Sequence, residues 1–247
     1  MYWTGPPAPR KVAGVATRGT TLPARRADPV RRGGVVVVSD SSGAPDWVVD
    51  WCRHSGRWLR RQHLPVAAEG DLPPSAQPVG EIAEIAAAAA RRGGAVLAVS
   101  GPAPVRSGPR RVVAAVQALP DDAPVLVDAA AVALHMGAEL VVTHGVPTSF
   151  AERSVGLDAA VDNARRLLEA AVGAAVDAVP GLTVEPRLLR VRPHEMVGEG
   201  LDADLLVLGG PRVPAPGGLG LVACSALHHA PCPVLLVPRV GRADFDF

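Results

Sequence analysis

The sequence predicts an α/β fold in which a mainly parallel sheet is covered by helices. Short runs of β-branched and aliphatic residues, such as 35–38 and 205–208, alternate with longer stretches that have a helical period. Apolar residues make up 48% of the chain but aromatic residues only 3%, so the core must consist of valine, leucine and alanine. Strands that are apolar on both faces are typical of parallel sheets, because helices then cover both faces.

Length, charge and cysteine content narrow the class of protein. The 247 residues suffice for one large domain or two modest ones. The formal net charge of +1 gives no reason to expect a nucleic acid or an anionic membrane as a partner. Cys52, Cys224 and Cys232 are too few for a disulfide framework and too poorly spaced for a zinc site. Because no membrane span or signal peptide is visible, a cytoplasmic protein with reduced thiols is expected.

Residues 1–33 are rich in proline, glycine and arginine and have no hydrophobic period. They are expected to form a disordered basic arm. Its seven basic residues against one acid could bring the arm to nucleic acid or to an acidic partner. A solvated leader without a partner, or a start codon placed too early, explains the same composition and is favoured.

A first unit is expected at 34–104. Its elements are a strand at 35–38, a helix at 44–61, a proline-rich loop at 65–78, a helix at 81–92 and a strand at 95–99. Trp47, Trp51 and Trp58 recur at helical intervals and are expected to form a buried stripe. A ligand platform made of these tryptophans is the less favoured alternative.

A second, complete unit is expected at 110–240, after a linker that is rich in proline. Its expected strands are 111–116, 139–142, 182–191, 205–208 and 234–237, and its expected helices are 125–136, 158–179, 193–199 and 221–229. The first unit repeats the order of strand, polar turn and helix, and again strand, glycine turn and proline. It has no counterpart of the final helix and strand, so it is a reduced copy.

The stretch 201–239 carries the most specific signal. It contains a strand that ends at Gly209, a loop rich in glycine and proline, a short helix and the run HHAPCPVLLV at 228–237. This stretch resembles the end of a universal stress protein domain, which has a strand, a G-x2-G-x9-G-(S/T) loop, a helix and a tail like HAPCPVLVV. The resemblance implies an open five-stranded parallel sheet of Rossmann-like type with strand order 3-2-1-4-5 and helices on both faces. A reduced second copy would then lie on the N-terminal side.

The resemblance also implies positions for an ATP site, because family members that bind ATP hold it at the carboxyl ends of the strands. The adenine contact falls on Gln117 and the contact after the second strand on Val146. The positions of the phosphate loop fall on Gly209, Gly210, Arg212, Gly220, Leu221 and Val222.

The chain departs from the family pattern within this loop. Arg212 stands in place of a glycine, Leu221 stands in place of the hydroxyl residue that opens the helix, and three prolines (211, 214 and 216) remove N–H donors. Gln117 can still hydrogen-bond a base edge, and Arg212 could pair with a phosphate. The expected cofactor is therefore none, or ATP bound weakly. From physics alone, a plain tight β–α connection explains the glycines slightly better than a phosphate site.

The other candidate residues give weaker indications of a functional role. Asp40, after the first strand, is expected to cap a helix, with an adenine contact as the alternative. His144 lies at a strand end, but no acid or second ligand stands at a matching spacing. No catalytic motif is present, so the protein is expected not to be an enzyme, or to be at most a weak ATPase.

The last strand is expected to mediate a homodimer. Its residues Val234, Leu235, Leu236 and Val237 form an apolar edge with open backbone groups unless another strand pairs with it, and in the family this strand pairs across a dimer or between tandem domains. The protein is therefore predicted to be a dimeric, non-catalytic stress-response or signalling protein with a degenerate nucleotide site. An ATP-binding stress sensor, with or without slow hydrolysis, is the alternative.

Overall fold

The computed structural model describes residues 33–39, 44–63, 77–99, 108–147, 157–213 and 218–240. Its strands are β1 (Val35–Ser39), β2 (Leu59–His63), β3 (Ala95–Val99), β4 (Arg111–Ala115), β5 (Glu139–Gly145), β6 (Val184–Leu189), β7 (Leu205–Val213) and β8 (Val234–Val240). Its helices are α1 (Asp46–Ser55), α2 (Gln77–Ala90), α3 (Ala123–Met136), α4 (Leu157–Ala178) and α5 (Leu221–His229). All of them belong to the unit Arg31–Phe247. The expected basic arm and Asp40 lie outside the described residues.

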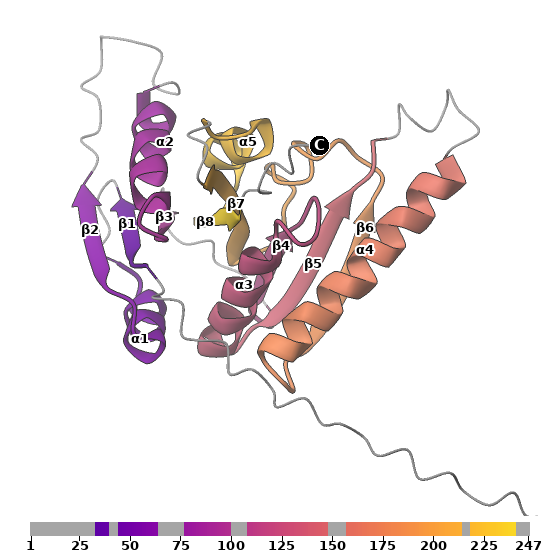
Figure 1. Cartoon of the computed structure of the whole chain (residues 1–247), viewed down its shortest axis with the longest axis horizontal. Helices are drawn as coiled ribbons and strands as arrows, with labels where there is room; N and C mark the ends of the chain where they lie inside the picture. Colours follow the sequence, from indigo (N-terminus) through magenta and orange to yellow (C-terminus); the bar gives the residue numbers. More distant parts are fainter. Residues whose placement is uncertain are drawn as a thin grey trace, which may run out of the picture. The chain divides into compact units, whose positions relative to one another are not determined.

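The eight strands form one sheet in the order β2-β1-β3-β8-β7-β4-β5-β6 (Figure 1). The five strands of the second half run β6-β5-β4-β7-β8, and all neighbours among them are parallel. Numbered within that half, the order is 3-2-1-4-5, which confirms the expected sheet. The first half adds the parallel strands β2, β1 and β3.

Strand β8 is an interior strand, so the expectation of an open edge at Val234–Val237 is wrong. β8 pairs in parallel with β7 on one side and antiparallel with β3 on the other. The β3 register places Ala98 opposite Val234, Leu97 opposite Leu235 and Val96 opposite Leu236. The N-terminal half thus supplies, within the same chain, the strand that the dimer was expected to supply. Because β3 and β7 occupy both sides of β8, its backbone groups cannot pair with a second copy of the chain. Dimerisation through another surface stays a prediction.

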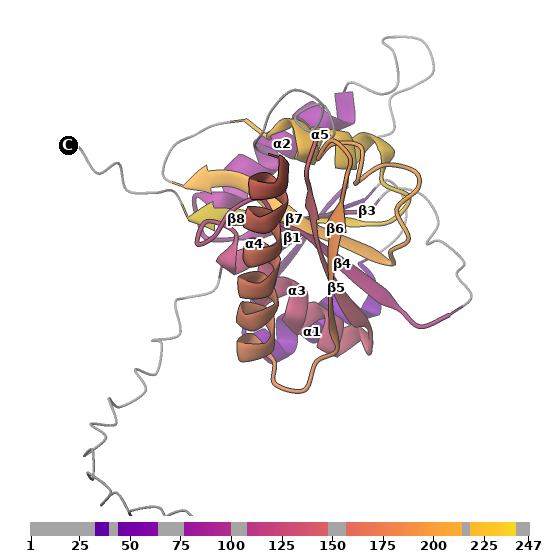
Figure 2. The same cartoon turned by 90° about the vertical axis from the view of Figure 1, so that its right-hand side faces the viewer.

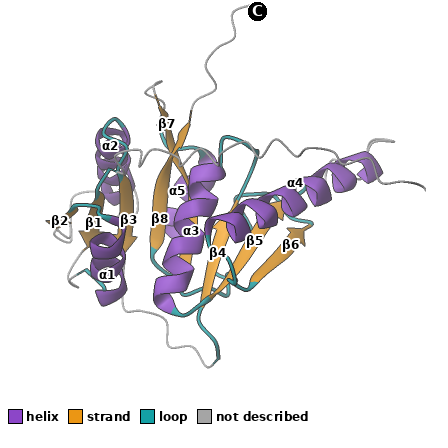
Figure 3. Ribbon diagram, turned by 60° about the horizontal axis from the view of Figure 1, so that its bottom comes forward, coloured by secondary structure: helices purple, strands orange, loops and turns teal. Residues whose placement is uncertain are grey.

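Two helical layers cover the sheet. Helices α1, α3 and α4 pack with one set of strand residues, and α2 and α5 pack with the other. Figure 3 shows α1, α3 and α4 in front of the strands, and Figure 2 shows α4 alongside β5 and β6. Alternate strand residues enter opposite layers: Leu205 and Val207 face the α3 side, and Leu206 and Leu208 face the α5 side. Complete burial of such side chains contributes about 1.5–3 kcal/mol each.

The first half departs from the predicted elements after Ser55. Helix α1 ends at Gly56, whose φ of 65° gives a left-handed cap that favours glycine. The segment predicted to continue this helix instead forms β2, a polar strand at the edge of the sheet with exposed Arg60 and Arg61. Trp51 is fully buried as expected, whereas Trp58 is 44% exposed and belongs to no helix.

Two further predictions at the strand ends are wrong. Residues 193–199 form turns and no helix. β7 does not end at Leu208 but continues to Val213, with a bulge between Gly209 and Arg212. Pro211 lies within that bulge, where a missing N–H is tolerated. Residues 209–213 of the predicted glycine- and proline-rich loop therefore belong to a strand. No described helix is long and apolar enough to span a bilayer.

Candidate functional site

A cavity of about 460 Å³ lies at the carboxyl ends of β4 and β5, beside the second half of β7 and the start of α5. Parallel strands end on the same side of their sheet, so the segments that follow them enclose this space together. The cavity volume is in the range of small-molecule sites, roughly 300–1,000 Å³. Most of the predicted nucleotide positions line it, namely Gln117, Gly209, Gly210, Arg212, Gly220, Leu221 and Val222.

A second cavity of about 350 Å³ adjoins the first and shares Gln117, His144 and Gly145 with it. Val146, the predicted second-strand contact, lines only this neighbouring space. The Nδ1 atom of His144 donates to the carbonyl of Val116 at 2.9 Å. This bond fixes the orientation of the imidazole ring.

Asp122 organises the turn between β4 and α3. Its side chain is fully buried, and Oδ2 accepts from the backbone N–H groups of Gln117 (2.6 Å) and Ala118 (3.0 Å). Oδ1 lies 2.8 Å from Arg239 Nε in an ion pair. A buried carboxylate needs such donors and a cation to offset its desolvation. Asp122 therefore fixes both the main chain at Gln117 and the side chain of Arg239.

Two arginines stand side by side along one wall of the cavity. Arg212 on β7 and Arg239 on β8 are register partners in neighbouring parallel strands. Arg212 Nη1 donates to Asp121 Oδ2 at 2.9 Å, and Arg239 Nη1 donates to Gln117 Oε1 at 3.2 Å. The acids Asp121 and Asp122 are 5% and 0% exposed. Each arginine is thus held from the protein interior by one of two consecutive aspartates.

Gly209 is required by the position of Arg239. A Cβ atom at residue 209 would overlap the guanidinium, with Arg239 Nε as the nearest atom. The cation therefore lies directly over the backbone of the first glycine in the predicted phosphate loop. Gln117, the predicted adenine contact, hydrogen-bonds this same cation. Both positions are engaged in contacts within the chain.

Helix α5 opens toward the cavity without a polar cap. Gly220 is the N-cap residue, no side chain caps the helix, and Leu221 at its first position is 70% exposed. The free N–H groups of a helix N-terminus attract acceptors, but the leucine adds no hydroxyl to them. Ser225 Oγ donates to the carbonyl of His194 at 3.0 Å, which fastens α5 to the turns at 193–199.

Sequence reasoning missed the residues that set the electrostatics of this site. Arg239 and the two acids, Asp121 and Asp122, were not among the predicted positions. Arg239 and Asp122 are far apart in the sequence, and only the order of β4, β7 and β8 brings them together. A signal was available only for the acids, which form a consecutive pair shortly after a buried strand.

Metal ligation and catalysis find little support in the described part of the chain. No three His, Cys, Asp or Glu side chains among those residues gather to hold a metal ion. Cys52, Cys224 and Cys232 form no disulfide. In the described segments around the cavity, the histidine is bonded to a backbone carbonyl and the acids to arginines. The arrangement can hold a ligand, but among the described residues that line the cavity no nucleophile stands beside a base.

Residues 108–238 match the model of the universal stress protein family. The solved universal stress protein from Archaeoglobus fulgidus is 25% identical, with a TM-score of 0.44 and coverage of 54% of this chain and 99% of that chain. The universal stress protein from Archaeoglobus fulgidus in complex with dAMP is 24% identical, with a TM-score of 0.43 and coverage of 53% and 97%. A universal stress protein from Archaeoglobus fulgidus DSM 4304 is 16% identical, with a TM-score of 0.43 and coverage of 84% and 85%. No curated protein matches the chain.

Proposed function

The chain belongs to the universal stress protein family, and we propose that it is a non-catalytic stress-response or signalling member with a degenerate nucleotide site. The cavity at the strand ends is present. The arginines that could bind a triphosphate are paired with acids of the chain, and no hydroxyl residue opens α5. The proposal concerns the site at the carboxyl ends of β4, β5 and β7. In it, Gln117, Val146 and the predicted loop positions are remnants of a nucleotide site.

One observation carries the proposal: the cationic groups of the site are neutralised from within the chain. Arg212 pairs with Asp121 at 2.9 Å and Arg239 with Asp122 at 2.8 Å, so the four side chains have no formal net charge. A triphosphate is a multiply charged anion, and its binding needs several hydrogen-bond donors and cations that are not already paired. Leu221 adds apolar surface where a helix-opening hydroxyl would donate. These contacts favour weak ATP binding or none.

The absence of turnover is part of the proposal. Phosphoryl transfer requires positioned cations and a group that orients the nucleophile. The titratable group closest to that role in the cavity is His144, and its Nδ1 is committed to Val116. An ATP-binding sensor is the alternative, and the size of the cavity together with the free N–H groups at the start of α5 supports it.

Isothermal titration of the full chain with Mg-ATP separates the two functions. We expect no saturable binding up to millimolar nucleotide. A dissociation constant tighter than about 10 µM, roughly −7 kcal/mol, contradicts the degenerate site and supports the sensor. Leu221→Asp is the matched variant, because its side chain is exposed and a carboxylate there repels phosphate without a loss of core packing. Any binding that persists in this variant does not involve the start of α5.

Localisation and assembly belong to the same proposal. Three cysteines that form no disulfide, two of them buried, are compatible with a reducing compartment such as the cytoplasm. A homodimer would have to use a surface other than β8, whose two sides are occupied by β3 and β7. Size-exclusion chromatography with light scattering measures the oligomeric state directly.

A further inference from the structure

We infer that the strand-end cavity binds a small monocarboxylic acid with an apolar body, held by Arg212 and Arg239. This inference rests on the proposed function, because it assigns a ligand class to a cavity that no longer grips a triphosphate. The described residues that line the cavity include no acid, and their charged or titratable members are Arg212, Arg239 and His144. Aliphatic groups and Met196 form most of the remaining wall.

The two arginines form a prepared anchor. They occupy register-matched positions on adjacent parallel strands, so their side chains leave the sheet next to each other. Asp121 accepts from Nη1 of Arg212. Gln117 accepts from Nη1 of Arg239, whose Nε lies 2.8 Å from Asp122 Oδ1 in an ion pair. The Nη2 atoms of both arginines donate to no residue that the structure describes. Side chains fixed from behind lose little further entropy when they bind a ligand.

The placement of the acids favours a single negative charge on the ligand. Asp121 and Asp122 are buried behind the guanidinium groups and do not line the cavity. A carboxylate therefore meets the arginines first, at hydrogen-bonding range, and the acids at a greater distance. Hydrogen bonds to a charged acceptor are stronger than those to a neutral one. A phosphate chain carries several negative charges, and a cluster of two arginines and two aspartates cannot balance them.

The rest of the cavity selects an apolar body. Leu208 and Met196 are buried in its wall, and the exposed Leu221 borders it. Covering Leu221 by a ligand removes apolar surface from water, which favours binding by about 25 cal/mol for each Å². In an aliphatic carboxylic acid, the carboxylate would contact the two arginines and the aliphatic chain would contact the apolar residues.

Octanoate is a suitable probe, and 1-octanol is its matched neutral control. In isothermal titration of the full chain, we expect octanoate to bind with a dissociation constant on the order of 100 µM and octanol to bind at least about tenfold more weakly. Arg212→Met, at an arginine whose side chain is 48% exposed, should weaken octanoate about tenfold and leave octanol unchanged. Arg166→Met, on the exposed side of α4, should change neither.

A second measurement does not depend on a variant. Octanoate should shift the side-chain Nε–Hε resonances of Arg212 and Arg239 in a ¹H–¹⁵N spectrum, while that of Arg166 stays fixed. Octanol that binds as tightly as octanoate, no octanoate binding at about 5 mM, or unshifted arginine resonances would each overturn the inference. Mg-ATP titrated into the same sample keeps the two proposals apart. Tight ATP binding contradicts the proposed function, whereas failure of both ligands contradicts only the carboxylate site.

Discussion

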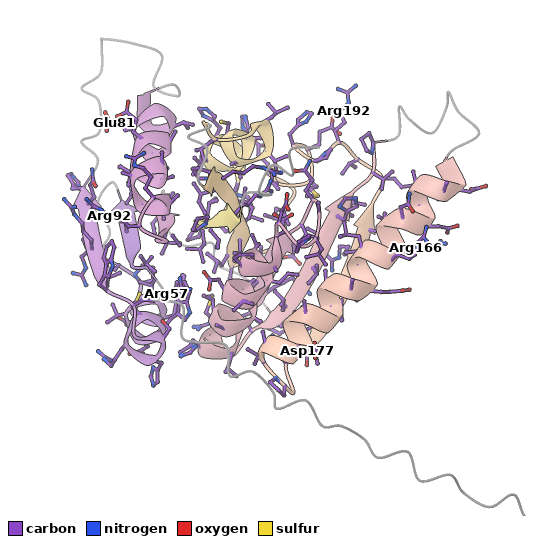
Figure 4. The ribbon with its side chains drawn as sticks, viewed as in Figure 1. Arg57, Glu81, Arg92, Arg166, Asp177 and Arg192 are labelled. Atoms are coloured by element: carbon purple, nitrogen blue, oxygen red, sulfur yellow. The ribbon has the colours of Figure 1, made fainter. Side chains whose placement is uncertain are left out.

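Arg57 and Asp128 form a buried ion pair that joins the two halves of the sequence, with Nη2 and Oδ1 2.5 Å apart. Arg57, labelled in Figure 4, follows α1, whereas Asp128 lies on α3 of the second half. Both side chains are less than a tenth exposed, and the guanidinium stacks 4.7 Å from the ring centre of Trp51. The N-terminal half is thus attached to the C-terminal half at a helix contact as well as along β3 and β8.

Arg57→Ala should destabilise the chain strongly. Removing one partner leaves a buried carboxylate with less compensation, which typically costs about 3–5 kcal/mol of unfolding free energy. Urea unfolding measures the loss. Arg53→Ala is the control, because its pair with Asp50 is more than half exposed and should contribute less than about 1 kcal/mol. Equal losses of unfolding free energy in the two variants would show that the buried pair stabilises the fold no more than the exposed pair does.

Gly209→Ala should displace Arg239 from its place over the β7 backbone. The new Cβ would overlap the guanidinium, and moving that group separates it from the buried Asp122, so we expect a loss of about 2–3 kcal/mol. A Cβ at Gly220 meets no described atom within 4 Å, and Gly220→Ala should be nearly neutral. Thermal unfolding of both variants tests this. A neutral Gly209→Ala variant would mean that Arg239 is not fixed at this site.

Cys52 should make stability depend on alkaline pH. Burial raises the pKa of its thiol from 9.0 to about 11, against a lowering by Arg57 and with a further rise from Asp128. The folded chain therefore keeps a proton that the unfolded chain loses above pH 9. The stabilisation is complete below pH 9 and declines by up to about 1.4 kcal/mol per pH unit as the pH rises toward 11.

Urea unfolding across this pH range, in the wild type and in Cys52→Ala, isolates the effect. The wild-type free energy of unfolding should fall more steeply above pH 9 than that of the variant. Parallel pH profiles would be incompatible with a thiol proton held by the folded state.

The backbone of β8 should be protected from exchange in the monomer. Its amides lie between β7 and β3, and interior strands open only with large parts of the fold. Hydrogen exchange at dilute concentration, where any dimer dissociates, should therefore show slow exchange at Val234–Leu236. The same experiment should show faster exchange in the edge strand β2. Fast exchange in β8 that slows with concentration would restore the dimer interface that the sequence suggested.

The second half of the fold was predictable because its strands and helices have clear periods. The runs at 111–116 and 234–237 could only be buried strands, and the resemblance supplied their order. β2 was missed because LRRQH has no apolar pattern, as is expected of an edge strand that must resist further pairing. The pairing of β3 with β8 was missed because strand partners depend on tertiary contacts between distant segments.

The candidate site was predictable only in its backbone. The glycines and the start of α5 surround the cavity as expected, because they follow from the strand–loop–helix order. The charges did not follow from the motif. Arg239 comes from the end of β8 and its partner Asp122 from the turn before α3, so their meeting could not be foreseen from spacing. That ion pair largely determines the affinity of the site for an anion.

Native mass spectrometry of the freshly purified chain tests the central claim most directly, because it reports what the cavity retains. The account predicts no added mass of an adenine nucleotide, even when Mg-ATP is supplied before buffer exchange. A stoichiometric adduct with the mass of ATP, ADP or AMP, lost in Leu221→Asp, would contradict a neutralised site.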